Sequence, residues 1–381
     1  MTLPRRRHRR RWPRRRRRRP PQLVDDVFGE ILLRLPPGDP ACLVRAAAVC
    51  RTWRRILADP AFPARYRAFH RTPPVLGFFH NPYPLGLARF VPTSSFGAPP
   101  PDRRGRHVLG CRHGRVLLED RESWDLIVWD PATGDERRLP EVPDIHTLGD
   151  RNAAVLCAAH GAGCDHRDCH GGPFLVASMG VGDKLDAHAY LFSSETGAWS
   201  APSVFQLEPT RSCLTIDRLP AAVAGDGVCF IGDYSDGILR YDLATRDLSL
   251  IAVPFDYDDD IIVTPMEDGE LGFACLNRQH RCILSLWSFV WFAGWVVLRV
   301  IDLEMLLSID KYMTPYLSGF AEDANVIFVN TDDGVFTIEL ESLQTRKIDV
   351  RDKSSPVFPY TSFYIPVLCA SGKSPPPVWI Q

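Results

Sequence analysis

The chain has 381 residues, 45% of them hydrophobic and 24% charged, which is enough for one small and one large globular domain. Its net charge of −1 hides an asymmetry, because residues 1–20 contain 12 arginines and no acidic residue. Without those arginines the remaining 33 basic side chains face 46 acidic ones, a net charge of −13, which disfavours nucleic-acid binding by the folded body.

Residues 1–20 are too charged to fold, so we expect a disordered Arg-rich tail. A nuclear-targeting role and a solvated extension without a role both fit this composition. No apolar stretch follows the charges as it would in a signal peptide, and an odd count of 11 cysteines favours reduced thiols. We therefore expect a protein of the nucleus, the cytoplasm or both.

Helical periodicity is confined to residues 23–69. The first expected helix has apolar residues at helical spacing and ends at Pro36-Pro37-Gly38. Its apolar positions are Leu23, Val27, Ile31, Leu32 and Leu35. Asp39-Pro40 predicts a cap and start for a second helix through Val49. Arg51–Leu57 forms a third, and the spacing of Phe62, Tyr66 and Phe69 suggests a short last helix.

From Pro73 onward the pattern changes to alternating apolar runs separated by turn residues, as in strands and hairpins. The expected strands include 75–79, 115–118, 126–129, 174–178, 188–192, 227–231, 238–242, 271–274, 326–329 and 335–340. A weak repeat ends strands in a polar corner, with Thr133, Thr196, Thr245 and Ser342 in equivalent places. Units of 40–50 residues predict a β-propeller-like domain of about six irregular blades, with an irregular sandwich as the other possibility.

The uncharged stretch Cys282–Leu298 is nearly long enough to span a membrane as a helix. Ala293-Gly294 interrupts it, however, and β-branched and aromatic residues dominate. Two buried strands joined by a tight turn explain it better, and we expect no membrane contact.

Leu23–Phe62 resembles the F-box motif. The matching features are Asp26, Glu30-Ile31-Leu32, Leu35-Pro36, the Val49-Cys50-Arg51-x-Trp53-Arg54 run and Asp59-Pro60-x-Phe62. The remainder is similar, as islands, to plant F-box proteins of the cereal type with strand-rich C-terminal regions. Those islands include Val128–Gly134 and Cys164–Phe174. The fold class implied is α+β: a three-helix F-box followed by an all-β propeller-like domain.

In that family the F-box binds a Skp-type adaptor, which docks onto a cullin, and the C-terminal domain holds a protein for ubiquitin transfer. The resemblance assigns the adaptor contact to Leu23, Val24, Ile31, Leu32, Leu35, Val49 and Cys50. Trp53 would brace the helices from within. Val24 stands where the family usually has proline, so the fixed backbone turn of proline is lost there.

Residues with metal-binding chemistry gather between His160 and His170. The candidate ligands are Cys164, His166, Cys169 and His170, which in principle suit Zn²⁺. Their spacing lacks the usual paired form, so a polar loop without metal is the expectation, and no cofactor is predicted. The acidic run Asp256–Asp260 is expected to be a solvated loop. No phosphate loop, nucleophile elbow or metalloprotease motif is found, and no catalytic residue is assigned.

The expected organisation is a tail at 1–20, an F-box domain at 21–69, a linker at 70–74, a β domain at 75–370 and a flexible tail at 371–381. The sequence predicts a non-catalytic substrate receptor of a Skp–cullin–F-box ubiquitin ligase, with an unknown target held by the β domain. Two alternatives remain: a propeller enzyme or metal-binding protein using the His160–His170 cluster, and a nuclear scaffold with a degenerate F-box.

Overall fold

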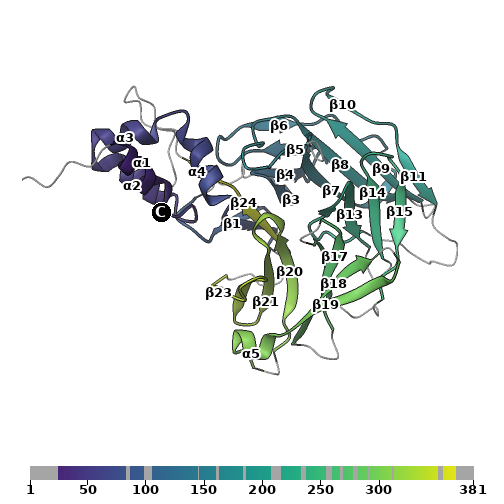
Figure 1. Ribbon diagram of the computed structural model, residues 1–381. Helices are drawn as coiled ribbons and strands as arrows, with labels where there is room; N and C mark the ends of the chain where they lie inside the picture. The colour runs from purple at the N-terminus through teal and green to yellow at the C-terminus, as the bar shows by residue number, and fades with distance from the viewer. Residues whose placement is uncertain are drawn as a thin grey trace, which may run out of the picture.

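The computed structural model describes residues 25–82, 86–97, 105–144, 146–159, 163–182, 186–206, 216–232, 237–254, 260–266, 269–277, 282–290, 292–310, 313–350 and 355–365. Four N-terminal helices lie at one side of a ring of β-sheets, and α4 stands between the other three helices and the ring (Figure 1). This arrangement confirms the predicted fold class.

The helices follow the predicted order. They are α1 (Asp25–Leu33), α2 (Ala41–Val49), α3 (Arg51–Leu57) and α4 (Phe62–His70). One detail of the prediction is wrong: Asp39 does not cap α2 through its side chain, since the N-cap position belongs to Pro40 without a side-chain hydrogen bond. The Asp39 carboxylate instead accepts hydrogen bonds from Ser95 and from the Cys42 thiol.

Among the described residues the strands form six sheets, which we number as blades in ring order. Blade 1 contains β2 (Arg89–Pro92), β1 (Val75–His80) and β24 (Val357–Thr361). Blade 2 contains β3 (Arg106–Arg112), β4 (Arg115–Asp120), β5 (Leu126–Trp129) and β6 (Glu136–Arg138). Blade 3 contains β7 (Leu148–Cys157), β8 (Phe174–Gly182), β9 (Asp186–Ser193), β10 (Ala198–Trp199) and β11 (Ser203–Gln206).

The other three blades have four antiparallel strands each. Blade 4 contains β12 (Ala222–Ala224), β13 (Gly227–Ile231), β14 (Ile238–Asp242) and β15 (Leu248–Ile251). Blade 5 contains β16 (Asp260–Pro265), β17 (Leu271–Leu276), β18 (Ile283–Val290) and β19 (Gly294–Asp302), followed by α5 (Leu303–Leu307). Blade 6 contains β20 (Tyr316–Ala321), β21 (Val326–Thr331), β22 (Gly334–Glu339) and β23 (Thr345–Ile348), with a 3₁₀ turn at Glu322–Ala324.

The ring closes because the last strand, β24, pairs antiparallel with the first, β1, from Val75 opposite Thr361 to His80 opposite Val357, with a register shift between Val75 and Gly77. β24 also lies against β20 of blade 6 and β3 of blade 2. A separate apolar cluster fills each boundary between neighbouring blades, including the boundary between blades 6 and 1 where the ring closes. Facing sheets thus bury each other, as in a propeller.

The uncharged stretch at 282–298 forms strands β18 and β19, which confirms the two-strand prediction. The expectation that both are buried is wrong for β19, an edge strand on which Leu298 and Val300 are each 59% exposed. None of the helices in the described ranges has both the length and the apolar character required to cross a membrane.

Candidate protein-binding surface

The N-terminal helices share a small core of their own. Its buried members include Leu32, Leu43, Leu57, Phe62 and Tyr66. The Tyr66 hydroxyl donates a 2.8 Å hydrogen bond to the carbonyl oxygen of Leu35, which satisfies a carbonyl beyond the end of α1. Burial raises the pKa of the Tyr66 phenol, so it stays a neutral donor.

Several apolar side chains of the same helices are left outside this core. Val27 and Ile31, one turn apart on α1, are 39% and 42% exposed, and Val49 at the end of α2 is 64% exposed. Cys50, which follows Val49, is also exposed. We call these four residues the exposed apolar set. Their exposure on a small helical module makes this set the candidate protein-binding surface.

The residues predicted for the adaptor contact therefore fall into four groups. Ile31, Val49 and Cys50 are exposed, and Leu35 is partly buried against the helical core. Leu32 is fully buried, so its side chain supports the surface from beneath and does not form part of it. Leu23 and Val24 lie outside the described residues. Val27 is not among the residues that the resemblance assigns to the adaptor contact, but its spacing from Ile31 places both on one face of α1.

Local geometry explains the shape of the α2–α3 corner. Cys50 has an extended backbone with φ of −159°, which ends α2 and begins α3. Its sulfur accepts a hydrogen bond from the backbone N–H of Trp53 at 3.5 Å, so a thiol caps the helix weakly. Trp53 is partly buried against the core and lies 6.1 Å from the ring of Phe28, as expected for a bracing residue.

The β domain covers a different part of the helical module. Phe363 and Ile365, which follow β24, pack into the helical core, and the Phe363 ring meets Tyr66 edge-on at 6.4 Å. The backbone N–H of Ala41 donates a 3.0 Å hydrogen bond to Ser95. These contacts fix the helices on the ring and still leave the exposed apolar set accessible.

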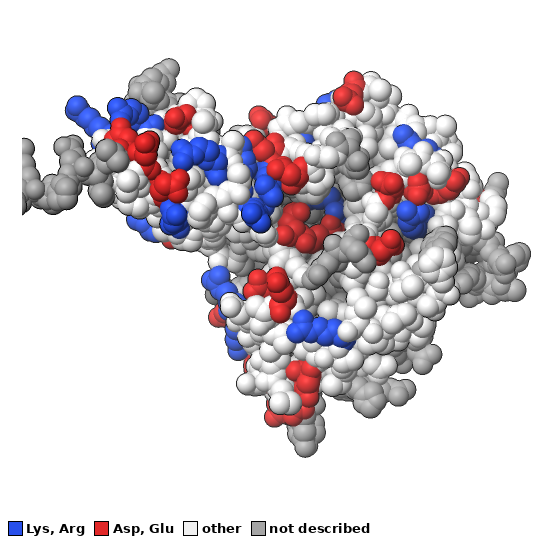
Figure 2. Space-filling view, in the orientation of Figure 1, with Lys and Arg blue, Asp and Glu red and all other residues white. Residues whose placement is uncertain are grey.

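Charged side chains surround the helical end of the molecule, with basic and acidic groups interspersed (Figure 2). Glu30 pairs with Arg34 at 3.1 Å and with Arg65 at 3.4 Å. Asp39 pairs with Arg45 at 2.8 Å, and hydrogen bonds from Ser95 and Cys42 lower the pKa of its carboxyl. Because these pairs are exposed, they contribute little stability and mainly set the polar surroundings of the apolar side chains.

A comparison with protein families matches residues 21–65 to the F-box domain. Residues 21–65 form an F-box domain. The match covers the first three helices and the start of α4. F-box domains typically bind Skp-type adaptors within cullin complexes, and the exposed apolar set lies within the matched segment.

Similarity of the whole chain to known proteins is distant. A search of curated proteins found no significant match. Among solved structures the chain is similar to the WD40 domain of SCAP from fission yeast, at 12% identity and a TM-score of 0.38, over 63% of this chain and 51% of that one. It is also similar to the extracellular domain of a one component system from B. thetaiotaomicron, at 10% identity and a TM-score of 0.35, over 65% of this chain and 28% of that one. The chain thus spans about half of the first structure and less of the second, and the six-bladed ring is established by its own strand pairing.

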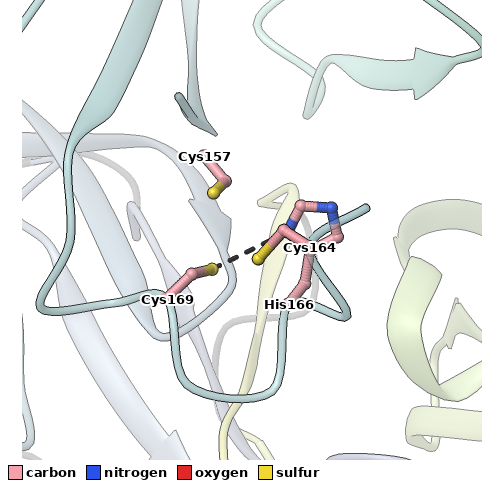
Figure 3. Close-up of side chains that lie close together, drawn as sticks. All are labelled: Cys157, Cys164, His166 and Cys169. Atoms are coloured by element: carbon pink, nitrogen blue, oxygen red, sulfur yellow. Dashed lines mark hydrogen bonds between the residues drawn. The ribbon is translucent and has the colours of Figure 1, made fainter. Parts of the chain in front are cut away.

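The loop between β7 and β8 brings together most of the predicted metal-ligating residues (Figure 3). The group contains three of the predicted candidates, Cys164, His166 and Cys169. Its fourth member is the buried Cys157, which the sequence did not indicate. His170 is not part of the group, since its Nδ1 lies 2.6 Å from a carboxylate oxygen of Asp130. His160 lies outside the described residues. Burial, and next the neighbouring Cys157 thiol, raise the pKa of Cys169 to about 12.

Charged residues also meet near the inner strands of blades 1, 2 and 6. Arg112 of β3 donates two hydrogen bonds to Glu322, one of them 2.7 Å long, and His113 lies 3.8 Å from Asp323. The Thr361 hydroxyl donates a 2.7 Å hydrogen bond to the carboxylate of Asp323. Each carboxylate here is paired with a neighbouring side chain, so the cluster ties blades 1, 2 and 6 together. Of the acidic run predicted as a solvated loop, residues 256–259 lie outside the described residues. Asp260 begins β16 and accepts a hydrogen bond from the Leu317 N–H at 2.6 Å.

Proposed function

We propose that this chain is a substrate receptor of a Skp–cullin–F-box ubiquitin ligase. In this proposal the F-box binds a Skp-type adaptor, and the propeller holds a protein whose identity is open. The supporting observation is that Val27, Ile31 and Val49 of an F-box domain remain exposed while the same chain covers the Phe363 side of the helices. Helix faces of this kind pack readily against partner helices.

The proposed mechanism is positional. The chain makes no bond itself, and a target held on the propeller meets a ubiquitin-charged enzyme at a raised effective concentration. The contacts between Phe363, Ile365 and the F-box core matter for this mechanism, because they hold the two parts of the chain in a fixed relation. A degenerate F-box that binds no adaptor is the competing possibility.

Adaptor binding tests the proposal directly. Full-length chain would be co-purified with a Skp-type adaptor, as wild type and as Ile31→Asp and Val49→Asp. Burying an unpaired carboxylate in the contact should weaken binding at least about 30-fold, the loss expected at an interface hot spot of 2 kcal/mol. Val204→Asp is the matched control, because Val204 is 49% exposed but lies on β11 in blade 3.

All three variants should keep the wild-type melting temperature, since each changes an exposed side chain. Wild type that fails to retain the adaptor, or equal retention by wild type and both F-box variants, would remove the proposal. Leu35→Asp is a poor probe, because Leu35 packs against the helical core and its replacement would unfold the module.

We also propose that the protein acts in the nucleus, the cytoplasm or both, with the Arg-rich segment 1–20 as a candidate targeting signal. Fluorescence imaging of the full chain and of a variant in which the 12 arginines are replaced by serine would test this. Secretion of the full chain would contradict the proposed location. An unchanged distribution in the variant would remove the targeting role alone.

A further inference from the structure

The loop that joins β7 to β8 gathers three thiols and one imidazole at a single point. Cys157 is the last residue of β7, and Cys164, His166 and Cys169 come from the loop. One potential ligand atom from each lies within 4.8 Å of all the others. The side chains come from both ends of the loop and converge at one place (Figure 3).

We propose that Cys157, Cys164, His166 and Cys169 bind one Zn²⁺ ion in a tetrahedral structural site. Bond lengths of about 2.3 Å to sulfur and 2.0 Å to nitrogen place tetrahedral ligand atoms about 3.5–3.8 Å apart. The sulfur of Cys169 lies 3.7 Å from Nδ1 of His166, which agrees with such an edge. The widest separation in the group needs a contraction of only about 1 Å, within the reach of side-chain rotation.

The ligand types select the ion. Thiolates are soft ligands that favour Zn²⁺ over Mg²⁺ or Ca²⁺, and a Cys₃His set is a recognised structural zinc set. Four protein ligands complete the tetrahedron and leave no position for water or substrate, so the ion would have a structural role.

The surroundings of the group suit a bound cation with three thiolates. Cys157 is 3% exposed, while the other three are half-buried, so the site is closed on the propeller side and open enough for the ion to enter. Three thiolates and one Zn²⁺ carry a net charge of −1. The Arg115 guanidinium lies beside them, donating hydrogen bonds to the carbonyl oxygens of Cys169 and of Gly172, the latter at 2.8 Å.

The hairpin holds the ligands in place before any ion binds. Cys157 pairs with Phe174 across β7 and β8, and the Ala158 N–H donates to Pro173 O at 3.1 Å, which closes the base of the loop. The His166 ring stacks on His113 of blade 2, with centroids 4.0 Å apart and planes inclined by 3°. Such outer contacts orient a ligating imidazole.

The position of the loop indicates what the ion would organise. Asp168, between two proposed ligands in sequence, forms an ion pair with Arg67 of α4. His170, just after the last ligand, bonds to Asp130 of blade 2. An ion that orders residues 164–169 would therefore also order a support between the F-box helices and the propeller.

Metal content tests the site. The full-length chain would be purified under reducing conditions without a metal-affinity step, incubated with Zn²⁺, desalted and measured by elemental analysis. Wild type should hold about one zinc per chain, and Cys164→Ser and Cys157→Ser should hold less than about a tenth of that. Cys282→Ser is the matched control, a half-buried cysteine in blade 5 that lies outside the group and should leave zinc unchanged.

Two further measurements keep the test decisive if a serine variant folds poorly. His166→Cys should retain zinc, because four thiolates also form a structural set, whereas His166→Ala should lose affinity. Co²⁺ in place of Zn²⁺ gives a spectroscopic check. Wild type loaded with Co²⁺ should show the intense visible absorption of a tetrahedral ion together with thiolate-to-cobalt charge-transfer bands. Both sets of bands should change in position and intensity in His166→Cys. Three outcomes would overturn the site. They are substoichiometric zinc in folded wild type, as much zinc in Cys164→Ser as in wild type, and a disulfide among these cysteines in protein purified under reducing conditions.

Discussion

Arg112 and Glu322 are 210 residues apart in sequence, yet a 2.7 Å hydrogen bond joins Nη2 of the arginine to Oε1 of the glutamate. The same guanidinium donates to Ala221 O at 3.2 Å, and the same carboxylate accepts from the Val223 N–H at 3.3 Å. Blades 2, 4 and 6 are thereby joined across the ring. Burial raises the pKa of Glu322, against the lowering effect of Arg112, so removal of the arginine would leave a poorly solvated acid.

We predict that Arg112→Met lowers the free energy of unfolding by about 3 kcal/mol, because loss of one partner leaves a largely buried charge uncompensated. The double variant with Glu322→Met should lose less than the sum of the two single variants. Chemical denaturation of all four proteins completes a double-mutant cycle. Strictly additive losses would mean that the two side chains are not coupled.

A close approach between blades 6 and 1 predicts an intolerant glycine. A Cβ at Gly319 in β20 would lie 2.3 Å from the carbonyl oxygen of Val357 in β24. Gly319→Ala should therefore force the two inner strands apart and cost about 1–3 kcal/mol. Gly110 is the matched control, since it also follows a register shift in an inner strand but its Cβ would meet nothing closer than 3.9 Å. Equal thermal stability of the two variants would contradict this interpretation.

The elements that the sequence predicted well depend on local interactions. The corners after β5 and β14 repeat because Asp130 and Asp242 each accept hydrogen bonds from the N–H groups two and three residues further on, for example from Ala132 at 2.8 Å and Ala244 at 3.0 Å. Such turns require particular residues at fixed offsets, so they are visible in a single sequence. The helices are visible for a similar reason, since proline and glycine mark their ends.

What the sequence did not predict depends on distant contacts or on featureless segments. β1 and β24 pair to close the ring although most of the chain lies between them in sequence, and no local pattern encodes such a distant pairing. All three residues of β6 are exposed, so this strand has no apolar alternation. Cys157 joins the cysteine–histidine group because β7 ends beside the loop, although six residues lie between it and Cys164 and no local pattern connects the two.

Neighbouring residues of α1 should respond oppositely to truncation. Leu32 is fully buried, so Leu32→Ala should destabilise the F-box helices by about 2–5 kcal/mol. Ile31 is 42% exposed, so Ile31→Ala should change stability by less than about 1 kcal/mol while weakening adaptor binding. Thermal unfolding and adaptor affinity, measured on both variants, separate the two roles. Comparable destabilisation by both would show that Ile31 belongs to the core.

His107 predicts a pH dependence in the acidic range. Burial, and then the charges of Arg121 and Arg218, lower its pKa to about 4 from an ordinary value of 6.5. Between these values the unfolded chain binds the proton and the folded chain does not, so stability falls as the pH drops from 6.5 towards 4. The contribution is at most about 1.4 kcal/mol per pH unit, and partial exposure reduces it.

Urea denaturation of wild type and His107→Gln between pH 4 and 7 checks this prediction. Carboxylates elsewhere affect both proteins alike, so the difference between the two curves isolates the histidine. The variant should lose less stability than wild type on acidification. Parallel curves would show that His107 is protonated in the folded protein as easily as in the unfolded chain.

Removal of zinc should lower thermal stability if the Cys157–Cys169 group holds the ion. An ion at a free concentration 100 times its dissociation constant stabilises the folded state by about 2.7 kcal/mol. For a domain of this size that corresponds to a fall in melting temperature of roughly 5–10 °C when a chelator is added. Cys164→Ser should start near the lower temperature and show no further change with chelator, and re-addition of Zn²⁺ should restore wild type alone. A chelator effect of equal size in Cys164→Ser would place the responsible ion elsewhere in the chain.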